Sequence, residues 1–339
     1  MKRTAMRIAF FEIQPWEQPL LEAAFQGHEL LFSDKPVQES DPTTLHEIEA
    51  LSVFIYSRVT REVIQSMPNL RLVATRSTGF DHIDITAAKE RDVIVSNVPS
   101  YGENTVAEHT FALILALSRN VHKSHVRRLR NNFSIEGLKG FDLKGKTLGV
   151  IGAGKIGLHV IKIARGFGMR VLAFDAHENT FLAEVLDYTY VPLEELLAQS
   201  DIISLHTPYL PTTHHLINET NIEQIKRGAI LINTARGELI DNDALIQGLD
   251  SGILAGVGLD VIEGEQLIRE EKELLAKHHQ PEDLQELIKD HILLGRDDVV
   301  YTPHIAFYSE EALHRILQTT IENITCFVDG TCQNIVSKD

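Results

Sequence analysis

The feature that most constrains this chain is a glycine-rich turn between a short apolar run and a longer amphipathic one. Residues 148–151 have the composition of a buried strand, and residues 152–157, Gly-Ala-Gly-Lys-Ile-Gly, fit the pattern G-x-G-x-x-G. Apolar residues then recur at helical spacing as far as Phe167, where flanking glycines predict a helix end. A second apolar run, residues 170–174, finishes on Asp175. We therefore expect a strand, a turn, a helix and a strand, in that order.

A dinucleotide requires this arrangement. Gly152 allows a tight turn, Gly154 lets the backbone approach a pyrophosphate, and Gly157 lets the helix pack closely on the strand. The helix N-terminus offers free N–H groups and a positive dipole end to the phosphates. Asp175 is suited to accept hydrogen bonds from ribose hydroxyls, and no Arg or Lys directly follows it to bind an NADP phosphate. The pattern predicts NAD binding, with an ordinary βαβ turn as the alternative.

Charge and composition exclude several classes of function. The 339 residues suffice for two domains. The formal net charge of −16 argues against nucleic acid or an anionic membrane as a partner, and an anionic substrate would need a local cation. No run of 18 apolar residues predicts a membrane span, and no apolar signal segment is present near the N-terminus. Cys326 and Cys332 are too few for a disulfide framework, so we expect a reduced, cytoplasmic setting.

Strands and helices alternate along the rest of the chain, which predicts an α/β fold. Strands are expected in the first hundred residues at 7–13, 29–32, 51–56, 70–75 and 93–98. Further strands are expected at 201–205, 230–233, 254–259 and 299–301, before a helix from Glu310 to about Val328. The fold class that follows is a Rossmann-type doubly wound parallel sheet plus a second α/β domain.

Two further segments have distinctive patterns. A helix is expected to begin at Asn104, which is a good N-cap residue, and its apolar residues face more than one side. We therefore expect that helix to be buried on several sides, between domains or subunits. Residues 264–298, rich in Glu, Lys and Leu, predict one or two surface helices interrupted at Pro281.

Polar residues with suitable chemistry follow several of the predicted strands. Ligands of open parallel sheets bind beyond the carboxyl ends of the strands, so these residues are expected to cluster. Arg236 can bind a carboxylate bidentately, and His304 can donate or accept a proton near neutral pH. Glu265 can pair with His304 and favour its protonated form. Taken singly, Arg236 could be a structural ion pair, Glu265 a solvated acid and His304 an ordinary loop histidine.

Together these segments resemble the D-isomer-specific 2-hydroxyacid dehydrogenases over nearly the whole chain. The matching segments are GAGKIG with Asp175, NTARG at 233–237, GLDV at 258–261 with EGE at 263–265, and TPH at 302–304. The resemblance implies that Arg236 binds substrate, Glu265 tunes the histidine and His304 transfers the proton. It also implies cofactor contacts at Lys155, Ile156, Asp175, Thr207, Pro208, Thr213, Thr234, Ala235 and Asp260. Asp260 could alternatively cap a strand end.

The resemblance also implies a domain arrangement. A discontinuous, flavodoxin-like substrate domain is expected at residues 1–103 and 305–339, and an NAD-binding domain at 104–304, with a cleft between them. A homodimer held partly by the helix that begins at Asn104 is expected as well.

Within the family, the D-lactate dehydrogenase branch has the most similar pocket residues. Ile305-Ala306-Phe307-Tyr308 and Tyr101 resemble that branch, and Thr78-Gly79 could offer backbone N–H groups to a carboxylate. Tyr101 and Phe307 would enclose a short side chain, unless they are ordinary core aromatics. We predict reversible reduction of a small 2-keto acid, pyruvate foremost, to the D-2-hydroxy acid with NADH.

Alternative functions remain within and outside the family. Hydroxyisocaproate, hydroxypyruvate and glyoxylate dehydrogenases are the alternatives of the same class, and an NAD-sensing corepressor-like binding protein is the non-enzyme alternative. No metal site is predicted, because the histidine pairs 122/125, 214/215 and 278/279 have no accompanying array with metal-ligand spacing.

Overall fold

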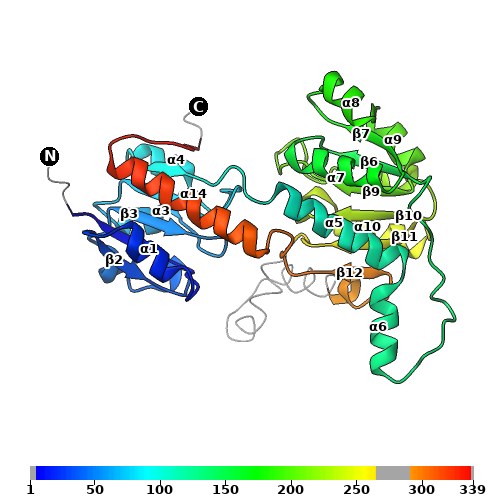
Figure 1. The fold of residues 1–339 in the computed structure, drawn as a ribbon, viewed down its shortest axis with the longest axis horizontal. Helices are drawn as coiled ribbons and strands as arrows, with labels where there is room; N and C mark the ends of the chain where they lie inside the picture. The colour runs from blue at the N-terminus through cyan, green and yellow to red at the C-terminus, as the bar shows by residue number, and fades with distance from the viewer. Residues whose placement is uncertain (1–4, 265–290, 337–339) are drawn as a thin grey trace. The chain divides into compact units, whose positions relative to one another are not determined.

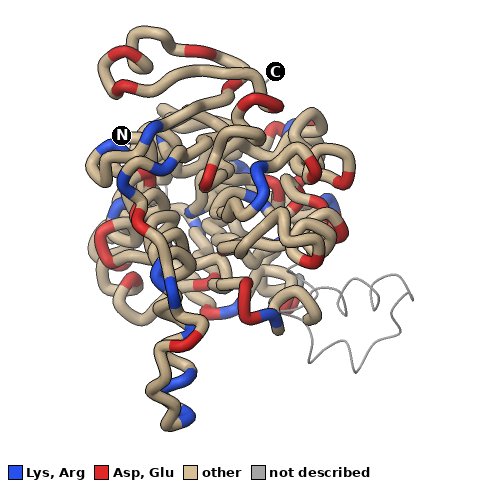
Figure 2. Tube along the Cα trace, turned by 90° about the vertical axis from the view of Figure 1, so that its right-hand side faces the viewer, with Lys and Arg blue, Asp and Glu red and all other residues tan. Residues whose placement is uncertain are grey.

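The computed structural model describes residues 5–264 and 291–336, and the chain divides into two compact units. One unit contains the residues up to Tyr101 and those from Ser309, and the other runs from Gly102 to Tyr308 (Figure 1). Glu265 and Pro281 lie outside the described residues. Among the described helices, none has the length and apolar character needed to cross a membrane. Figure 2 shows Asp and Glu spread along the trace.

The discontinuous unit is a parallel sheet with helices on both faces. Its strands are β1 (Arg7–Phe10), β2 (Glu29–Phe32), β3 (Ala50–Val53), β4 (Leu72–Thr75) and β5 (Ile94–Ser96). Its helices are α1 (Gln18–Ala24), η1 (Val37–Glu39), α2 (Pro42–Leu45), α3 (Arg61–Ser66), α4 (Ile85–Glu90) and α14 (Glu310–Val328). The strand order β2-β1-β3-β4-β5 is the flavodoxin-like order. The expected flavodoxin-like α/β domain is therefore confirmed.

Alternation along the strands of this unit creates two cores. Ile8 and Phe10 of β1 pack with Leu317 and Ile324 of α14, whereas Ala9 lies in the separate core on the opposite face. Successive side chains of a strand point to opposite faces, so fully apolar strands need a cover on both sides. This explains why the C-terminal helix belongs to the N-terminal sheet.

The second unit is built on a seven-stranded parallel sheet. Its strands are β6 (Thr147–Ile151), β7 (Arg170–Phe174), β8 (Thr189–Tyr190), β9 (Ile202–Leu205), β10 (Ala229–Asn233), β11 (Leu254–Leu259) and β12 (Val299–Tyr301). Its helices are α5 (Glu103–Ser118), α6 (Val121–Leu129), α7 (Lys155–Gly166), α8 (Thr180–Leu186), α9 (Leu193–Gln199), η2 (Ile222–Gln224), η3 (Gly237–Leu239) and α10 (Asn242–Asp250). The order β12-β11-β10-β9-β6-β7-β8 reverses direction between β6 and β9, which is the Rossmann pattern. The predicted doubly wound sheet is confirmed.

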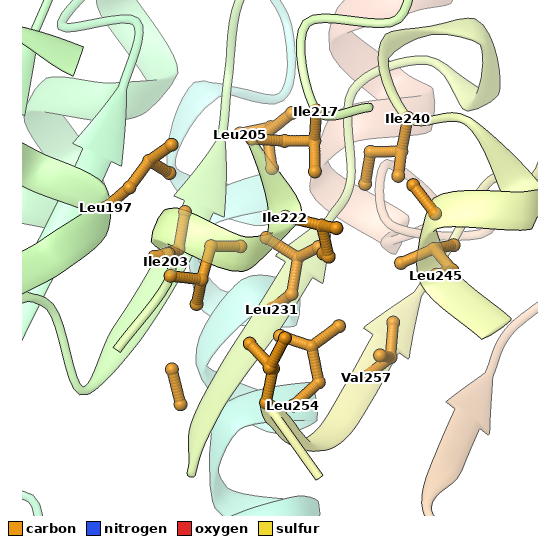
Figure 3. Packing of buried hydrophobic residues seen from close by; sticks show 14 of the residues in the cluster. Leu197, Ile203, Leu205, Ile217, Ile222, Leu231, Ile240, Leu245, Leu254 and Val257 are labelled. Carbon is orange, nitrogen blue, oxygen red and sulfur yellow. The ribbon is translucent and has the colours of Figure 1, made fainter. Parts of the chain in front are cut away.

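Two helical layers cover this sheet. Side chains of α5 and α7 pack on one face, and those of α9, η2 and α10 pack on the other. Figure 3 shows the second of these cores, where Ile203, Leu231 and Val257 of three neighbouring strands meet Ile222 and Leu245. A sheet covered on both faces leaves its strand ends as the place for ligands.

Several sequence predictions of element bounds were wrong. Strands β1, β4 and β5 are shorter than expected, since β1 ends at Phe10, β4 begins at Leu72 and β5 spans Ile94–Ser96. Helix α5 begins at Glu103 with Gly102 as its N-cap, and Asn104 lies inside the first turn with its amide on Glu108. Strand β3 ends at Val53 rather than at Tyr56, because the Glu12 carboxylate accepts the N–H groups of the following loop. In addition, α6 forms within a stretch for which no helix was expected.

Candidate active site

The carboxyl ends of the parallel strands in the second unit form one edge of the sheet. Backbone hydrogen bonds connect neighbouring ends: Gly152 N–H donates to Phe174 O at 2.8 Å, and His206 N–H to Ile151 O at 2.7 Å. On the other side, Asp260 N–H donates to Asn233 O at 2.9 Å. The sequence-predicted residues that follow these strands therefore lie on one edge, as the parallel topology requires.

The glycine-rich turn has the shape that a pyrophosphate needs. Gly152 has a φ of +96°, and a Cβ there would lie 2.8 Å from the backbone of His206 and of Thr207. A Cβ on Gly157 would lie 2.0 Å from Gly152 O, so α7 packs directly on the turn. By contrast, a Cβ on Gly154 would meet nothing within 4 Å. The open side of the turn is thus at Gly154, where the first N–H groups of α7 begin.

Asp175, the residue predicted to bind the ribose, holds the glycine-rich turn through its carboxylate. Its Oδ2 accepts from Ala153 N–H at 2.7 Å, and its Oδ1 accepts from His177 N–H at 2.8 Å. Each carboxylate oxygen has further acceptor capacity, so ribose hydroxyls can still bind. Lys155 is exposed at the start of α7, with its Nζ 4.0 Å from a Glu103 carboxylate oxygen.

The loop after β9 contributes two buried polar atoms without protein partners among the described residues. These are Nδ1 of His206 and Oγ1 of Thr207, both beside the glycine turn. Burial lowers the pKa of His206 to about 3, so its imidazole is neutral. Further along this loop, Thr213 Oγ1 donates to Pro208 O at 2.8 Å. A nucleotide bound at the turn would offer hydrogen-bond donors and acceptors to both atoms. The residues present therefore fit NAD.

Asn233 fixes the loop that carries Arg236. The Asn233 amide donates to Arg236 O at 2.7 Å and accepts from Ala235 N–H at 3.0 Å. The Arg236 guanidinium is half-buried and donates to Ala235 O at 2.7 Å. Thr234 is buried at the strand end, next to α5. The structure thus places a cation on the same sheet edge as the cofactor turn.

The segment before Glu265 crosses directly over this loop. A Cβ on Gly237 would lie 2.1 Å from the Ile262 carbonyl carbon and 2.3 Å from Glu263 N, so only glycine fits. Glu265 itself lies outside the described residues, so its predicted pairing with His304 stays a prediction. Its neighbour Glu263 accepts from His215 Nε2 at 2.9 and 3.0 Å.

His215 and Glu263, with His214, also place metal-ligand atoms within 4.8 Å of one another. The direct hydrogen bonds between His215 and Glu263 account for the closeness of that pair. The exposed His214 stacks its ring on that of His215, with 3.9 Å between the centroids. A hydrogen-bonded pair with a stacked neighbour explains the cluster without a metal ion.

The segment after β12 carries His304 in an unusual backbone conformation. Its φ is +54°, and its N–H donates to both Asp260 O and Thr302 O at 2.8 Å. The His304 side chain is half-buried, and the ring of the buried Phe307 lies edge-on to it at 6.4 Å. Non-glycine residues with positive φ are uncommon and cluster at functional sites.

Asp260, predicted as a cofactor contact, binds its own chain in this structure. It is fully buried, and its carboxylate accepts from Thr302 Oγ1, Ile305 N–H and Ala306 N–H. The interpretation as a strand-end cap, left open by the sequence, agrees with these contacts.

The remaining predicted residues, Thr78, Gly79 and Tyr101, lie in the other unit. Thr78 follows β4, and its hydroxyl donates to Val98 O at 2.8 Å. Gly79 O accepts from Ser77 Oγ at 2.6 Å, and Tyr101 O accepts from the Arg315 guanidinium of α14 at 2.6 Å. Thr78 and Gly79 thus follow the carboxyl end of a strand in their own sheet.

Sequence reasoning missed His109 and Thr110 of α5. The His109 ring contacts Thr302, and Thr110 Oγ1 lies 3.0 Å from Thr234 Oγ1. Both partners are more than 120 residues away along the chain. No local pattern marks such pairs.

Comparison with known proteins agrees with this geometry. Residues 111–306 match the family model of the D-isomer specific 2-hydroxyacid dehydrogenase, NAD binding domain. The chain is 37% identical to the D-lactate dehydrogenase of Escherichia coli strain K12, over 97% of this chain and 99% of that one. It is 38% identical to the aromatic 2-oxoacid reductase of Clostridium sporogenes, over 84% and 85% of the two chains.

A solved structure is also similar over most of the chain. The D-lactate dehydrogenase from Aquifex aeolicus, complexed with NAD and lactic acid, superposes with a TM-score of 0.86. It is 38% identical and aligns 95% of this chain with 96% of that one. Since sequence, fold and cofactor turn agree, this chain belongs to the D-isomer-specific 2-hydroxyacid dehydrogenases, which makes it an NAD-dependent oxidoreductase of 2-hydroxy acids.

Proposed function

We propose that this enzyme reversibly reduces a small 2-keto acid, pyruvate foremost, to the D-2-hydroxy acid. One observation carries the proposal. Arg236 follows β10, His304 follows β12 and the glycine-rich turn follows β6, so all three lie at the carboxyl edge of one parallel sheet. A 2-keto acid offers a carboxylate for a cation and a carbonyl oxygen that must gain a proton. When bound, NADH supplies the hydride.

Each of the three predicted catalytic residues has one task. Arg236 binds the substrate carboxylate and polarises the adjacent carbonyl. Because the protein has a net charge of −16, it needs a local cation to bind an anionic substrate. His304 donates the proton to the carbonyl oxygen in reduction and accepts it in oxidation. Glu265 pairs with His304 and keeps its imidazole protonated for reduction. The buried Phe307 beside His304 limits the access of water.

The cofactor contacts are assigned to the edge of the second sheet. We propose that Gly152, Gly154 and Gly157 admit the pyrophosphate and that Asp175 accepts hydrogen bonds from the ribose. The other contacts are assigned to Lys155, Ile156, Thr207, Pro208, Thr213, Thr234 and Ala235, whereas the buried Asp260 carboxylate binds its own chain and is kept as a strand-end cap. The unpartnered Oγ1 of Thr207 supports this assignment most directly.

The substrate side chain is proposed to be small. Thr78 and Gly79 would hold the carboxylate from the unit that begins the chain, and Tyr101 with Phe307 would enclose a methyl group. This assignment makes the unit of residues up to 101 and from 309 the substrate domain. Similarity to a D-lactate dehydrogenase supports pyruvate, whereas similarity to an aromatic 2-oxoacid reductase supports a larger keto acid as the second candidate.

NADH oxidation with a panel of keto acids tests the proposal. Pyruvate, phenylpyruvate, 2-ketoisocaproate, hydroxypyruvate and glyoxylate are compared in parallel, with chiral analysis of the product. Best turnover on pyruvate to D-lactate is expected. His304→Gln should abolish turnover, while His46→Gln, an exposed histidine of the other unit, should not. Tight NADH binding without any turnover would instead favour an NAD-sensing binding protein.

We also propose a homodimer, with α6 and the segment after it as the contact surface. The apolar residues of α5 pack against α7, β10 and β11 within the chain. Exposed apolar residues lie instead on α6, which extends away from the sheet of its unit, and just beyond it (Figure 1). They are Val121, Val126, Leu129, Phe133 and Ile135.

The basic charge of this surface favours contact with the acidic remainder of a second copy rather than with the same helix of that copy. The α6 helix carries Lys123, Arg127 and Arg128 in a chain of net charge −16. Phe133→Asp should halve the mass measured by light scattering. Phe181→Asp, which alters a 70% exposed side chain elsewhere, is the matched control. A monomeric wild-type protein would contradict the proposal.

A further inference from the structure

His109 of α5 reaches the segment that carries His304. Its Nε2 lies 2.9 Å from Thr302 Oγ1 and 3.5 Å from the nearer carboxylate oxygen of Asp260. The His109 side chain is 19% exposed, whereas that of Asp260 is 0% exposed. All four residues belong to the unit from Gly102 to Tyr308. A helix on one face of the sheet is thereby connected to the loop at its edge.

The hydrogen-bond pattern determines which atom of this group carries each proton. Thr302 Oγ1 and Asp260 Oδ1 are 2.5 Å apart, so a proton must lie between them, and the threonine hydroxyl supplies it. A hydroxyl has one proton to donate. Thr302 therefore accepts from His109, whose Nε2 must carry a hydrogen. The direction of the chain is from His109 to Thr302 to Asp260.

The Asp260 carboxylate also binds the backbone N–H groups of the residues that follow His304. Oδ1 also accepts from Ile305 N–H at 2.9 Å, and Oδ2 accepts from Ala306 N–H at 2.8 Å. The main-chain oxygen of Asp260 accepts from His304 N–H at 2.8 Å. Asp260 thus binds Thr302 before His304 and Ile305 after it, and these bonds hold His304 in its conformation with positive φ.

We propose that His109 is a positioning residue for His304, acting through Thr302 and Asp260. The inference rests on the proposed role of His304 in proton transfer. Without the donor on His109, the Thr302 hydroxyl keeps only its bond to Asp260, and the side chain that holds Thr302 in place from α5 is lost. The loop can then relax from the left-handed conformation at His304, and the imidazole moves from its position for proton transfer.

The first experiment compares two substitutions of His109. His109→Leu removes the donor, and kcat should fall on the order of 10²-fold, as for a displacement of about 1 Å in a catalytic group. The KM for NADH should stay unchanged. His109→Gln places an amide N–H near the position of Nε2 and should recover most of the loss. Glu108→Gln, at an exposed neighbouring position on α5, is the matched control and should behave as wild type.

Substitutions of the middle residue test the path itself. Thr302→Val keeps the shape but loses the hydroxyl, whereas Thr302→Ser keeps the hydroxyl and should stay close to wild type. The double variant His109→Leu/Thr302→Val should lose no more activity than either single variant, because both break one path. Fully additive losses would overturn the proposal. Thr302→Val also serves as the deciding variant if His109→Leu does not fold.

Amide hydrogen exchange at Ile305 and Ala306 gives a readout that does not depend on turnover. Exchange should become faster in His109→Leu and return to the wild-type rate in His109→Gln. Equal losses in both variants, or unchanged kcat and exchange in His109→Leu, would overturn the positioning role. If the wild-type protein reduces none of the keto acids, the proposed function fails, and the exchange rates still decide the role of His109.

Discussion

Replacing His206 by glutamine should make the folded protein less sensitive to mild acid. His206 follows β9, and its Nε2 lies 2.8 Å from the hydroxyl of the buried Ser204. Burial lowers the pKa of His206 from 6.5 to about 3, because a charged imidazole would be removed from water. Glutamine keeps an amide group near the position of Nε2 and does not titrate.

The sign of the effect follows from proton binding. Below pH 6.5 the unfolded chain binds a proton at His206 that the folded protein does not bind until about pH 3. The free energy of unfolding therefore falls as the pH falls, by about 1.4 kcal/mol for each pH unit in that window. The whole window sets an upper bound on the order of 5 kcal/mol, lowered by the partial exposure of the residue. Above pH 6.5 this contribution does not change with pH.

Urea unfolding of the wild type and His206→Gln, at pH 7 and at pH 5, measures this effect. The difference in unfolding free energy should shift in favour of the glutamine variant by up to about 2 kcal/mol between the two values of pH. His46→Gln, which alters an exposed histidine, should show no such shift. A constant difference between wild type and His206→Gln would mean that the folded protein protonates His206 freely, and the reasoning from burial would be refuted.

Other substitutions test the cofactor turn and the catalytic residues. Gly157→Ala should abolish NADH binding in a fluorescence titration, because the new Cβ would lie 2.0 Å from Gly152 O, and wild-type affinity would contradict this packing. Asp175→Ala should weaken NAD and improve the relative use of NADP in steady-state kinetics, and an unchanged preference would remove the ribose assignment. Arg236→Lys keeps the charge but loses the bidentate fork, so kcat/KM should fall by an amount equivalent to about 2–4 kcal/mol, whereas a near-wild-type rate would exclude a substrate clamp. Glu265→Gln should lower the apparent pKa in the pH profile of reduction, and an unmoved profile would break the proposed pairing with the catalytic histidine.

Strands and helices that depend on local pattern were predictable from the sequence. The bounds of β7, β11 and β12 agree with the expected ranges, because their apolar runs are flanked by residues that end a strand. The early end of β3 was not predictable. It depends on the carboxylate of Glu12, which takes the N–H groups of Phe54 and Tyr56 more than 40 residues away.

The candidate site shows the same division. Parallel strands bring their carboxyl ends to one edge, so strand-end residues such as Arg236 and His304 could be selected from the sequence. The contacts that orient them could not be selected in this way. His109 and Thr302 are 193 positions apart, and only the packing of α5 on the sheet brings them together. The role of Asp260 was ambiguous for the same reason, since its donors follow another strand.

Backbone conformations with positive φ identify residues of this kind, which the sequence alone does not. Of the eight described non-glycine residues with positive φ, five are Asp or Asn, whose short polar side chains tolerate that region. The other three are Glu12, His215 and His304. Each is fixed by hydrogen bonds that reach beyond its own turn: the Glu12 carboxylate binds the loop after β3, His215 binds Glu263, and His304 N–H binds Asp260 O. A strained backbone conformation persists only where surrounding contacts hold it in place. These three positions therefore mark places where hydrogen bonds fix the backbone conformation. His304 is the proposed proton donor, and His215 binds Glu263, two residues before Glu265. Two of the three strained positions therefore lie at or near residues proposed to take part in the reaction.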